Sequence, residues 1–215
     1  MFINSKWISY GLCFLYLLFN KIFGIDDNQF WTSIKFEKQL PYSLELECEQ
    51  ELRLKNQLST FNQTFSEVSI TYKINDRLNI HIPYRYAIFD EKIKKRISFG
   101  GTYKFNLNPI SVKYRSRFQR TKEQEKDIEN LIRNKLTFQY MLDKKIEPFL
   151  SGELMHFPKA ENQTLDGYRF SLGFTFNLPR KNSIKIFYIF KKGDFSSSGS
   201  EEINIYGLTY SLKLN

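Results

Sequence analysis

Apolar and polar residues alternate through most of the chain after residue 28. In the clearest run, from Tyr42 to Leu54, apolar side chains occupy the even positions and are interrupted only by Gln50. Glutamates fill the odd positions from 45 to 51. A helix would spread these glutamates around its circumference, whereas a strand places them all on one face. The run therefore predicts a β-strand with one apolar and one acidic face.

Ten further runs repeat this period-2 pattern, which is typical of strands whose two faces meet different surroundings. They lie at 30–38, 67–74, 78–86, 96–105, 110–118, 135–142, 146–156, 168–177, 183–191 and 203–214. The connections between runs are alternately short and long. Short turns are predicted near 40–41, 75–77, 106–108, 143–145 and 179–182, and longer loops at 55–65, 88–95, 120–131, 157–167 and 192–202. This order is typical of an up-and-down membrane barrel, whose short turns face the periplasm.

Alternation alone does not distinguish a membrane barrel from a soluble, lipocalin-like one, because the two differ in which face points inward. Strand length favours the membrane, since about 9–11 tilted residues cross the hydrocarbon layer. Aromatic residues near the run ends on the apolar face also favour it, because they are typical of interfacial girdles. These are Tyr42, Tyr84, Tyr86, Tyr103, Phe105, Phe118, Tyr168 and Tyr206.

We therefore predict an all-β fold, an antiparallel up-and-down transmembrane β-barrel of 10–12 strands. Eleven runs are counted in the sequence. Single-chain bacterial barrels have even strand numbers, so twelve strands are preferred.

Residues 1–24 have the features of a cleaved signal peptide. Lys6 supplies the positive start, and the apolar run from Trp7 to Phe19 is too short for a spanning helix. We expect cleavage after Gly24, which leaves residues 25–215 as one barrel domain in the bacterial outer membrane. The alternatives are an uncleaved anchor and lipidation at Cys13, which a poor lipobox precedes.

The composition excludes a helical membrane bundle and agrees with a barrel. Mean hydropathy is −0.44 and hydrophobic residues make up 41% of the chain, whereas a helical bundle needs several apolar runs of about 20 residues. The net charge of +9 comes from basic residues scattered along the chain, which argues against a nucleic-acid partner. The expected partners are outer-membrane lipid, including lipopolysaccharide, and the outer-membrane assembly machinery. The sequence predicts no oligomeric state.

Several stretches resemble the family known as domain of unknown function 2490, a group of small outer-membrane barrels. The most specific match is Ile132–Leu136 followed by Glu147–Leu154, and Phe30–Ser33, Leu44–Leu54, Tyr168–Gly173 and Tyr206–Tyr210 also correspond. The resemblance covers nearly all of residues 28–215. It implies the barrel fold and carries no activity.

If the apolar face meets lipid, the polar faces line the lumen. The expected network of charged lumen residues comprises Glu45, Glu47, Glu49, Glu51, Arg85, Lys113, Arg115, Arg117, Arg133, Lys135, Glu153 and Arg169. A row of like charges on one strand is unfavourable unless opposite charges lie across from it, and the facing arginines would supply these. We expect a salt-bridge network that largely plugs the lumen and a structural, envelope-related role. The first alternative is a small porin or solute channel with opposed acidic and basic walls.

The second alternative is a membrane-embedded hydrolase or acyl-modifying enzyme. His81 with Ser69 or Ser98 and a glutamate would be its candidate catalytic set. Nothing in the spacing requires this chemistry, so the sequence predicts no enzyme and no catalytic residue. No cofactor or metal site is expected, because the sequence has no Cys/His cluster. Gly100-Gly101 lies inside a strand and indicates a bend or close packing rather than a phosphate loop.

Overall fold

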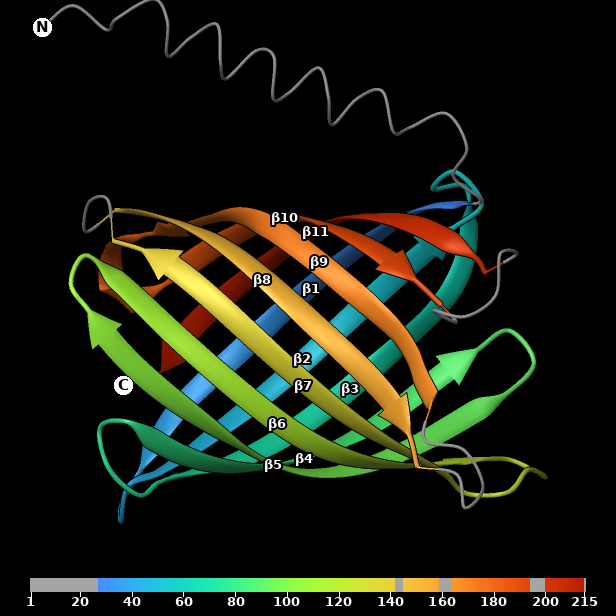
Figure 1. Ribbon diagram of the computed structural model, residues 1–215, viewed down its shortest axis with the longest axis horizontal. Helices are drawn as coiled ribbons and strands as arrows, with labels where there is room; N and C mark the ends of the chain where they lie inside the picture. Colours follow the sequence, from blue (N-terminus) through green and yellow to red (C-terminus); the bar gives the residue numbers. More distant parts are fainter. Residues whose placement is uncertain (1–26, 142–144, 159–163, 194–199, 215) are drawn as a thin grey trace, which may run out of the picture.

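The computed structural model describes residues 27–141, 145–158, 164–193 and 200–214, which form one closed β-barrel (Figure 1). The expected signal peptide, residues 1–24, lies outside the described residues, as do parts of the loops predicted at 157–167 and 192–202. The strands are β1 (Asp27–Leu40), β2 (Leu44–Lys55), β3 (Thr60–Lys73), β4 (Leu78–Phe89), β5 (Ile93–Leu107), β6 (Ile110–Glu123), β7 (Glu129–Tyr140), β8 (Ile146–Phe157), β9 (Thr164–Asn177), β10 (Ser183–Lys192) and β11 (Glu202–Leu214), with a 3-10 turn η1 (Pro179–Lys181). No helix in the described part of the chain is long and apolar enough to cross a membrane.

Each strand pairs antiparallel with its neighbour in the chain, and β1 pairs with β11 in parallel to close the barrel. Asp27 lies opposite Ile203 at one end of this seam and Lys38 opposite Leu214 at the other. With an odd strand number the first and last strands run in the same direction, so one parallel pair is unavoidable. The transmembrane barrel of 10–12 strands is thus confirmed. Within the described residues the preference for twelve antiparallel strands is wrong, because β1 and β11 bond directly to each other.

Most strands are longer than the alternating runs, with 10–15 residues each, although β2 is not. The loop predicted at 55–65 shrinks to 56–59, and the loop predicted at 120–131 shrinks to 124–128. The ladder of hydrogen bonds continues past the apolar band, as the pairing of Thr121 with Glu129 shows. We call the rim that carries Thr121 and Glu129 the long-loop end. The opposite rim, with turns at 41–43, 74–77 and 108–109, is the short-turn end.

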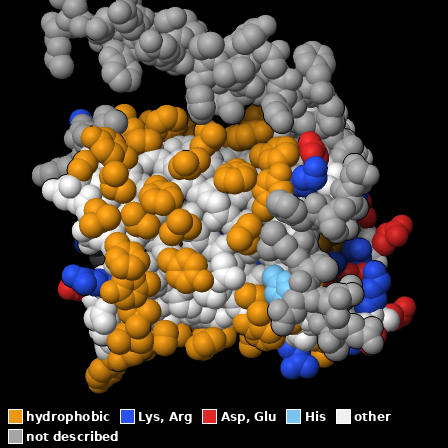
Figure 2. All heavy atoms as spheres, viewed as in Figure 1, with side chains coloured by type: hydrophobic (Ala, Val, Ile, Leu, Met, Phe, Trp, Pro, Cys, Tyr) orange, Lys and Arg blue, Asp and Glu red, His pale blue; other side chains and the backbone are white. Residues whose placement is uncertain are grey.

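Apolar side chains point outward and polar side chains point into the barrel. On β3, Val68 and Ile70 are half-exposed whereas Glu67 and Ser69 are buried. Figure 2 shows apolar side chains spread over the face of the barrel, with charged groups gathered at its two ends. A soluble barrel would have the opposite arrangement, so the lipocalin-like alternative is wrong.

A few aromatic and aliphatic side chains also face inward on β10, β11 and β1, the strands at the closing seam. Phe187 lies opposite Gly173 on one neighbouring strand and Gly207 on the other. A Cβ at Gly207 would lie 2.0 Å from the Phe187 ring, so the glycine leaves the space that the ring fills. Nearer the long-loop end, Trp31 packs with Ile203 and Ile205. These groups give part of the lumen wall an apolar surface.

The orientation of the two faces predicts that an added charge destabilises the barrel more on the outer face than in the lumen. Leu150 on β8 is 53% exposed on the outer face, whereas Thr71 on β3 lines the lumen. Leu150→Arg should lower the free energy of unfolding by about 2–4 kcal/mol, the cost of arginine on the lipid face near mid-membrane. Thr71→Arg should have a much smaller effect. Urea unfolding in lipid vesicles measures both, and equal effects would contradict the assignment of the faces.

Candidate functional site

The lumen holds a polar cavity of about 740 Å³ that is lined by side chains from all eleven strands. Because side chains alternate across each strand, every second residue faces the lumen, and the middle ones of these line the cavity. The structure brings all twelve predicted charged residues to it: Glu45, Glu47, Glu49, Glu51, Arg85, Lys113, Arg115, Arg117, Arg133, Lys135, Glu153 and Arg169. The lining contains eleven Lys and Arg side chains and eight Asp and Glu side chains, so it is positive on balance.

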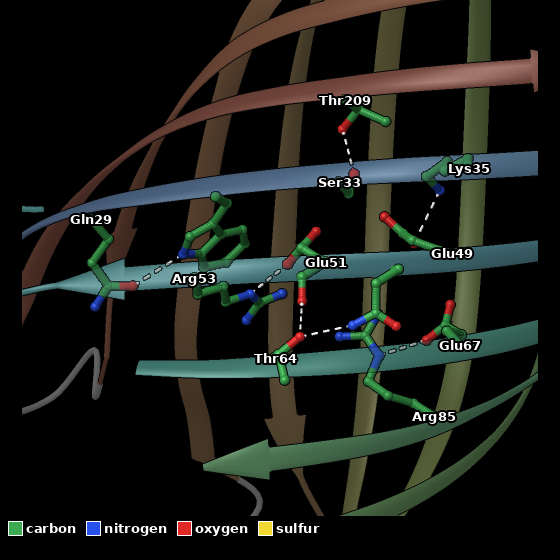
Figure 3. A network of polar contacts seen from close by, with 12 residues as sticks. Gln29, Ser33, Lys35, Glu49, Glu51, Arg53, Thr64, Glu67, Arg85 and Thr209 are labelled. Carbon is green, nitrogen blue, oxygen red and sulfur yellow. Dashed lines mark hydrogen bonds and ion pairs between the residues drawn. The ribbon is translucent and has the colours of Figure 1, made fainter. Parts of the chain in front are cut away.

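Lysines of the two adjacent strands neutralise much of the glutamate row on β2, and Figure 3 shows one of them, Lys35, beside Glu49. The Lys35 Nζ atom on β1 lies 3.1 Å from Glu47 Oε1 and 3.2 Å from Glu49 Oε2. The Lys73 Nζ atom on β3 lies 2.8 Å from Glu45 Oε2. From the sequence, arginines facing the row were expected in this role, and neither lysine was predicted as a partner. Their inward positions in their own alternating runs were the available signal.

Two arginines complete the acidic side of the lumen. The Arg53 Nε atom donates to Glu51 Oε1 at 2.5 Å, and the Arg85 Nε atom donates to Glu67 Oε2 at 2.6 Å (Figure 3). Both are charge-assisted hydrogen bonds between partly buried groups. Arg85 was among the predicted lumen residues and Arg53 was not. The acidic side is therefore largely paired within β1–β4.

On the opposite side, Glu153 of β8 is shared by three arginines. Arg133 makes two hydrogen bonds to it, from Nε to Oε1 at 3.1 Å and from Nη2 to Oε2 at 2.6 Å. Arg115 donates from Nη2 at 3.2 Å, and Arg169 Nη1 lies 3.9 Å away. Glu153 is only 5% exposed. One carboxylate thus holds together side chains from β6, β7 and β9.

Like charges face each other across the basic side of the lumen. Arg117 lies opposite Arg133 in the β6–β7 ladder, and Arg115 lies opposite Lys135. Like charges at directly opposed positions destabilise a sheet. Neither Arg117 nor Lys135 makes an ion pair with any described residue. The basic side therefore carries positive charge that the described side chains leave uncompensated.

His81, the candidate base of the enzyme alternative, lies buried in the lumen wall. It accepts a hydrogen bond at Nε2 from Arg117 Nε, at 3.3 Å. Gly100 makes room for it, since a Cβ there would lie 2.7 Å from His81 Nε2. Within the described part of the chain, His81 makes no hydrogen bond with Ser69, Ser98 or a glutamate. The described residues contain no group of three or more His, Cys, Asp or Glu side chains that could hold a metal ion.

Known proteins resemble this chain in sequence and in fold. A family model described as "Protein of unknown function (DUF2490)" matches residues 28–201. The solved structure of the NanC porin aligns with a TM-score of 0.53 at 10% identity, covering 83% of this chain and 93% of its own. At that identity the likeness shows a shared fold.

Two larger structures also match with lower scores. An anion-selective porin from Comamonas acidovorans gives a TM-score of 0.41 at 10% identity and covers 80% of this chain. OpdL of Pseudomonas aeruginosa gives 0.36 at 13% identity and covers 74% of this chain. In each case 54% of the matched structure is covered. No curated protein sequence matches the chain significantly.

The shared carboxylate predicts unequal effects of removing single glutamates. Glu153→Gln should lower the free energy of unfolding by about 3 kcal/mol, because three partly buried arginines lose their counter-charge. Glu47→Gln should cost about 1 kcal/mol or less, because Lys35 keeps its contact with Glu49. Urea unfolding in detergent micelles measures both variants. Equal losses would show that Glu153 does not organise its side of the lumen.

Proposed function

The chain belongs to the DUF2490 family of proteins of unknown function, and from this member's lumen we propose that it is a narrow solute channel of the bacterial outer membrane. The cavity of about 740 Å³, to which every strand contributes, carries the proposal. A fully plugged barrel would have its inward side chains packed against one another. The proposal includes export through the predicted signal peptide and contact of the apolar band with outer-membrane lipid.

The chemistry of the lining supports passage of polar solutes rather than storage of an apolar ligand. Most residues of the cavity wall are charged or carry a hydroxyl, and Trp31, Phe149, Phe187 and Ile189 add apolar area to it. Charged rings and walls are the usual means by which pores select among solutes. The matched NanC structure is described as a porin, which agrees with this proposal.

A rigid, non-conducting barrel is the second candidate function. The observation that favours it is the row of ion pairs along β1–β4, where Lys35, Arg53, Lys73 and Arg85 contact glutamates. This network stiffens one wall and keeps its side chains close to the strands. The two candidates differ in one measurable respect, since only the first carries current.

Conductance through planar bilayers tests the channel directly. The purified full chain should produce discrete current steps. Ser171→Trp, which places an indole in the lumen, should reduce the step size, because Ser171 lines the cavity. Leu172→Trp is the matched control, since the next residue of the strand points to the opposite face.

Two results would contradict the proposal. A wild-type protein that folds and inserts without any current would favour the rigid barrel. Equal loss of current in Ser171→Trp and Leu172→Trp would show that the current does not pass through the lumen.

A further inference from the structure

Four arginines surround the lumen at the junction of two cavities. The second cavity has a volume of about 150 Å³ and lies toward the long-loop end, where Phe89 and Lys94 line it. Among the described residues, only Arg53, Arg85, Arg133 and Arg169 line both cavities. We call these four residues the arginine ring. They come from β2, β4, β7 and β9, which are distributed around the closed barrel, so positive charge approaches the junction from several sides.

The second cavity has no acidic side chain in its lining. Beside the ring it is lined by Lys94, Arg96, Gln63, Ala87 and Phe89. Arg96 lies directly opposite Arg85 in the β4–β5 ladder and makes no ion pair with a described residue. Its Nε atom donates to the hydroxyl of Thr121 at 3.0 Å instead. The charged side chains that line this second cavity are thus all positive, and one of them, Lys94, is paired with Glu123 beside the cavity at 2.6 Å.

Aromatic side chains hold two guanidinium groups of the arginine ring in place. The Arg53 guanidinium lies 3.5 Å from the centre of the Trp31 ring, and the Arg85 guanidinium lies 3.5 Å from the centre of the Phe65 ring. Stacking of this kind orients the planar group and leaves its edge donors free. Arg53 uses Nε for Glu51, and Nη1 donates to the side-chain oxygen of Gln63 at 2.7 Å when that amide is in its hydrogen-bonding orientation, so Nη2 remains for another acceptor.

Arg169 is the least compensated member of the ring. Its only ion pair with a described residue is the 3.9 Å contact to Glu153, and Arg133 and Arg115 approach the same carboxylate more closely. Its Nε atom is buried without a hydrogen-bond partner in the structure. It also lies opposite Lys191 in the β9–β10 ladder. A buried unpaired donor beside a second cation is unfavourable unless an anion completes the site.

We propose that the arginine ring binds oxyanion groups of small solutes, carboxylates or phosphates, and makes the lumen anion-selective. Guanidinium groups suit these groups because two parallel N–H donors match two oxygens. The selectivity rests on the proposed channel function, whereas the binding does not require conduction. The experiment is therefore divided into a binding arm and a current arm, which fail separately.

The binding arm uses Trp31 as an internal probe. The chain has two tryptophans, Trp7 and Trp31, so a Trp7→Phe background leaves the one that contacts Arg53. Inorganic phosphate, and separately acetate, should change Trp31 fluorescence saturably when chloride at equal ionic strength serves as the reference. Arg169→Gln should weaken phosphate binding about tenfold, as expected for loss of hydrogen bonds to a charged group.

Two further variants separate charge from geometry. Arg169→Lys keeps the charge and removes the planar fork, so phosphate binding should weaken while anion selectivity is largely retained. Lys104→Gln removes one positive charge from the same lumen away from the ring, and Lys104 makes no ion pair with a described residue. It should leave phosphate binding unchanged. Far-UV circular dichroism checks that each variant is folded.

The current arm measures the reversal potential in a salt gradient at low ionic strength, where screening is weak. Wild type should favour anions, and Arg169→Gln should reduce this preference more than Lys104→Gln does. A response to phosphate alone, or to acetate alone, supports the site and identifies its group. A response no greater than that of chloride, or equal effects of Arg169→Gln and Lys104→Gln, would overturn the proposal. Currents without anion preference would overturn the selectivity and leave the channel intact.

Discussion

The fold depends on one constraint, which is that hydrocarbon offers no hydrogen-bond partner to a peptide group. The closed ladder of eleven strands satisfies this constraint, and the parallel seam between β1 and β11 supplies the bonds that a sheet edge would lack. Once the ladder is closed, each strand presents one face to lipid and one to the lumen. The charged residues of the alternating runs are thereby brought into a narrow space. The charged residues lie close together in the lumen because the peptide groups must all be hydrogen-bonded within a closed barrel.

Within the lumen, acidic side chains are mostly ion-paired, whereas several basic side chains are not. Acidic side chains on β2 and β3 find cations on the same or adjacent strands, such as Lys35 between Glu47 and Glu49. The basic side has Glu153 as a shared acceptor, and Arg117 and Lys135 stand opposite other cations. A structure selected for rigidity alone would gain by replacing some of these cations with neutral residues. Their presence in the lumen favours a role that uses positive charge, as the proposed channel with its arginine ring does.

Alternation predicted the strands and divided each into two sets of side chains, because the period is two. The Glu45 to Glu51 row could be placed on one face for that reason. Strand length and the aromatic residues near the run ends then indicated that the polar set faces the lumen. The partners could not be predicted in the same way. Which residue faces Glu49 depends on the register that the turn at 41–43 imposes on β1 and β2, and a shift of one residue would replace Lys35. The grouping of Arg115, Arg133 and Arg169 around Glu153 depends on side-chain reach across several strands. The preference for twelve strands was wrong because it came from the even strand numbers of other bacterial barrels, whereas β1 and β11 pair directly in this chain.

The cationic cavity lies toward one end of the barrel and not at its centre. A narrow conduit whose fixed charge is displaced toward one mouth behaves as a rectifier, because one polarity of voltage fills it with counter-ions and the other empties it. Its current–voltage curve would then bend in a direction set by which mouth faces the positive electrode. The same asymmetry would report the direction in which each molecule has inserted, so that a population of mixed orientation could be sorted by the sign of the curvature.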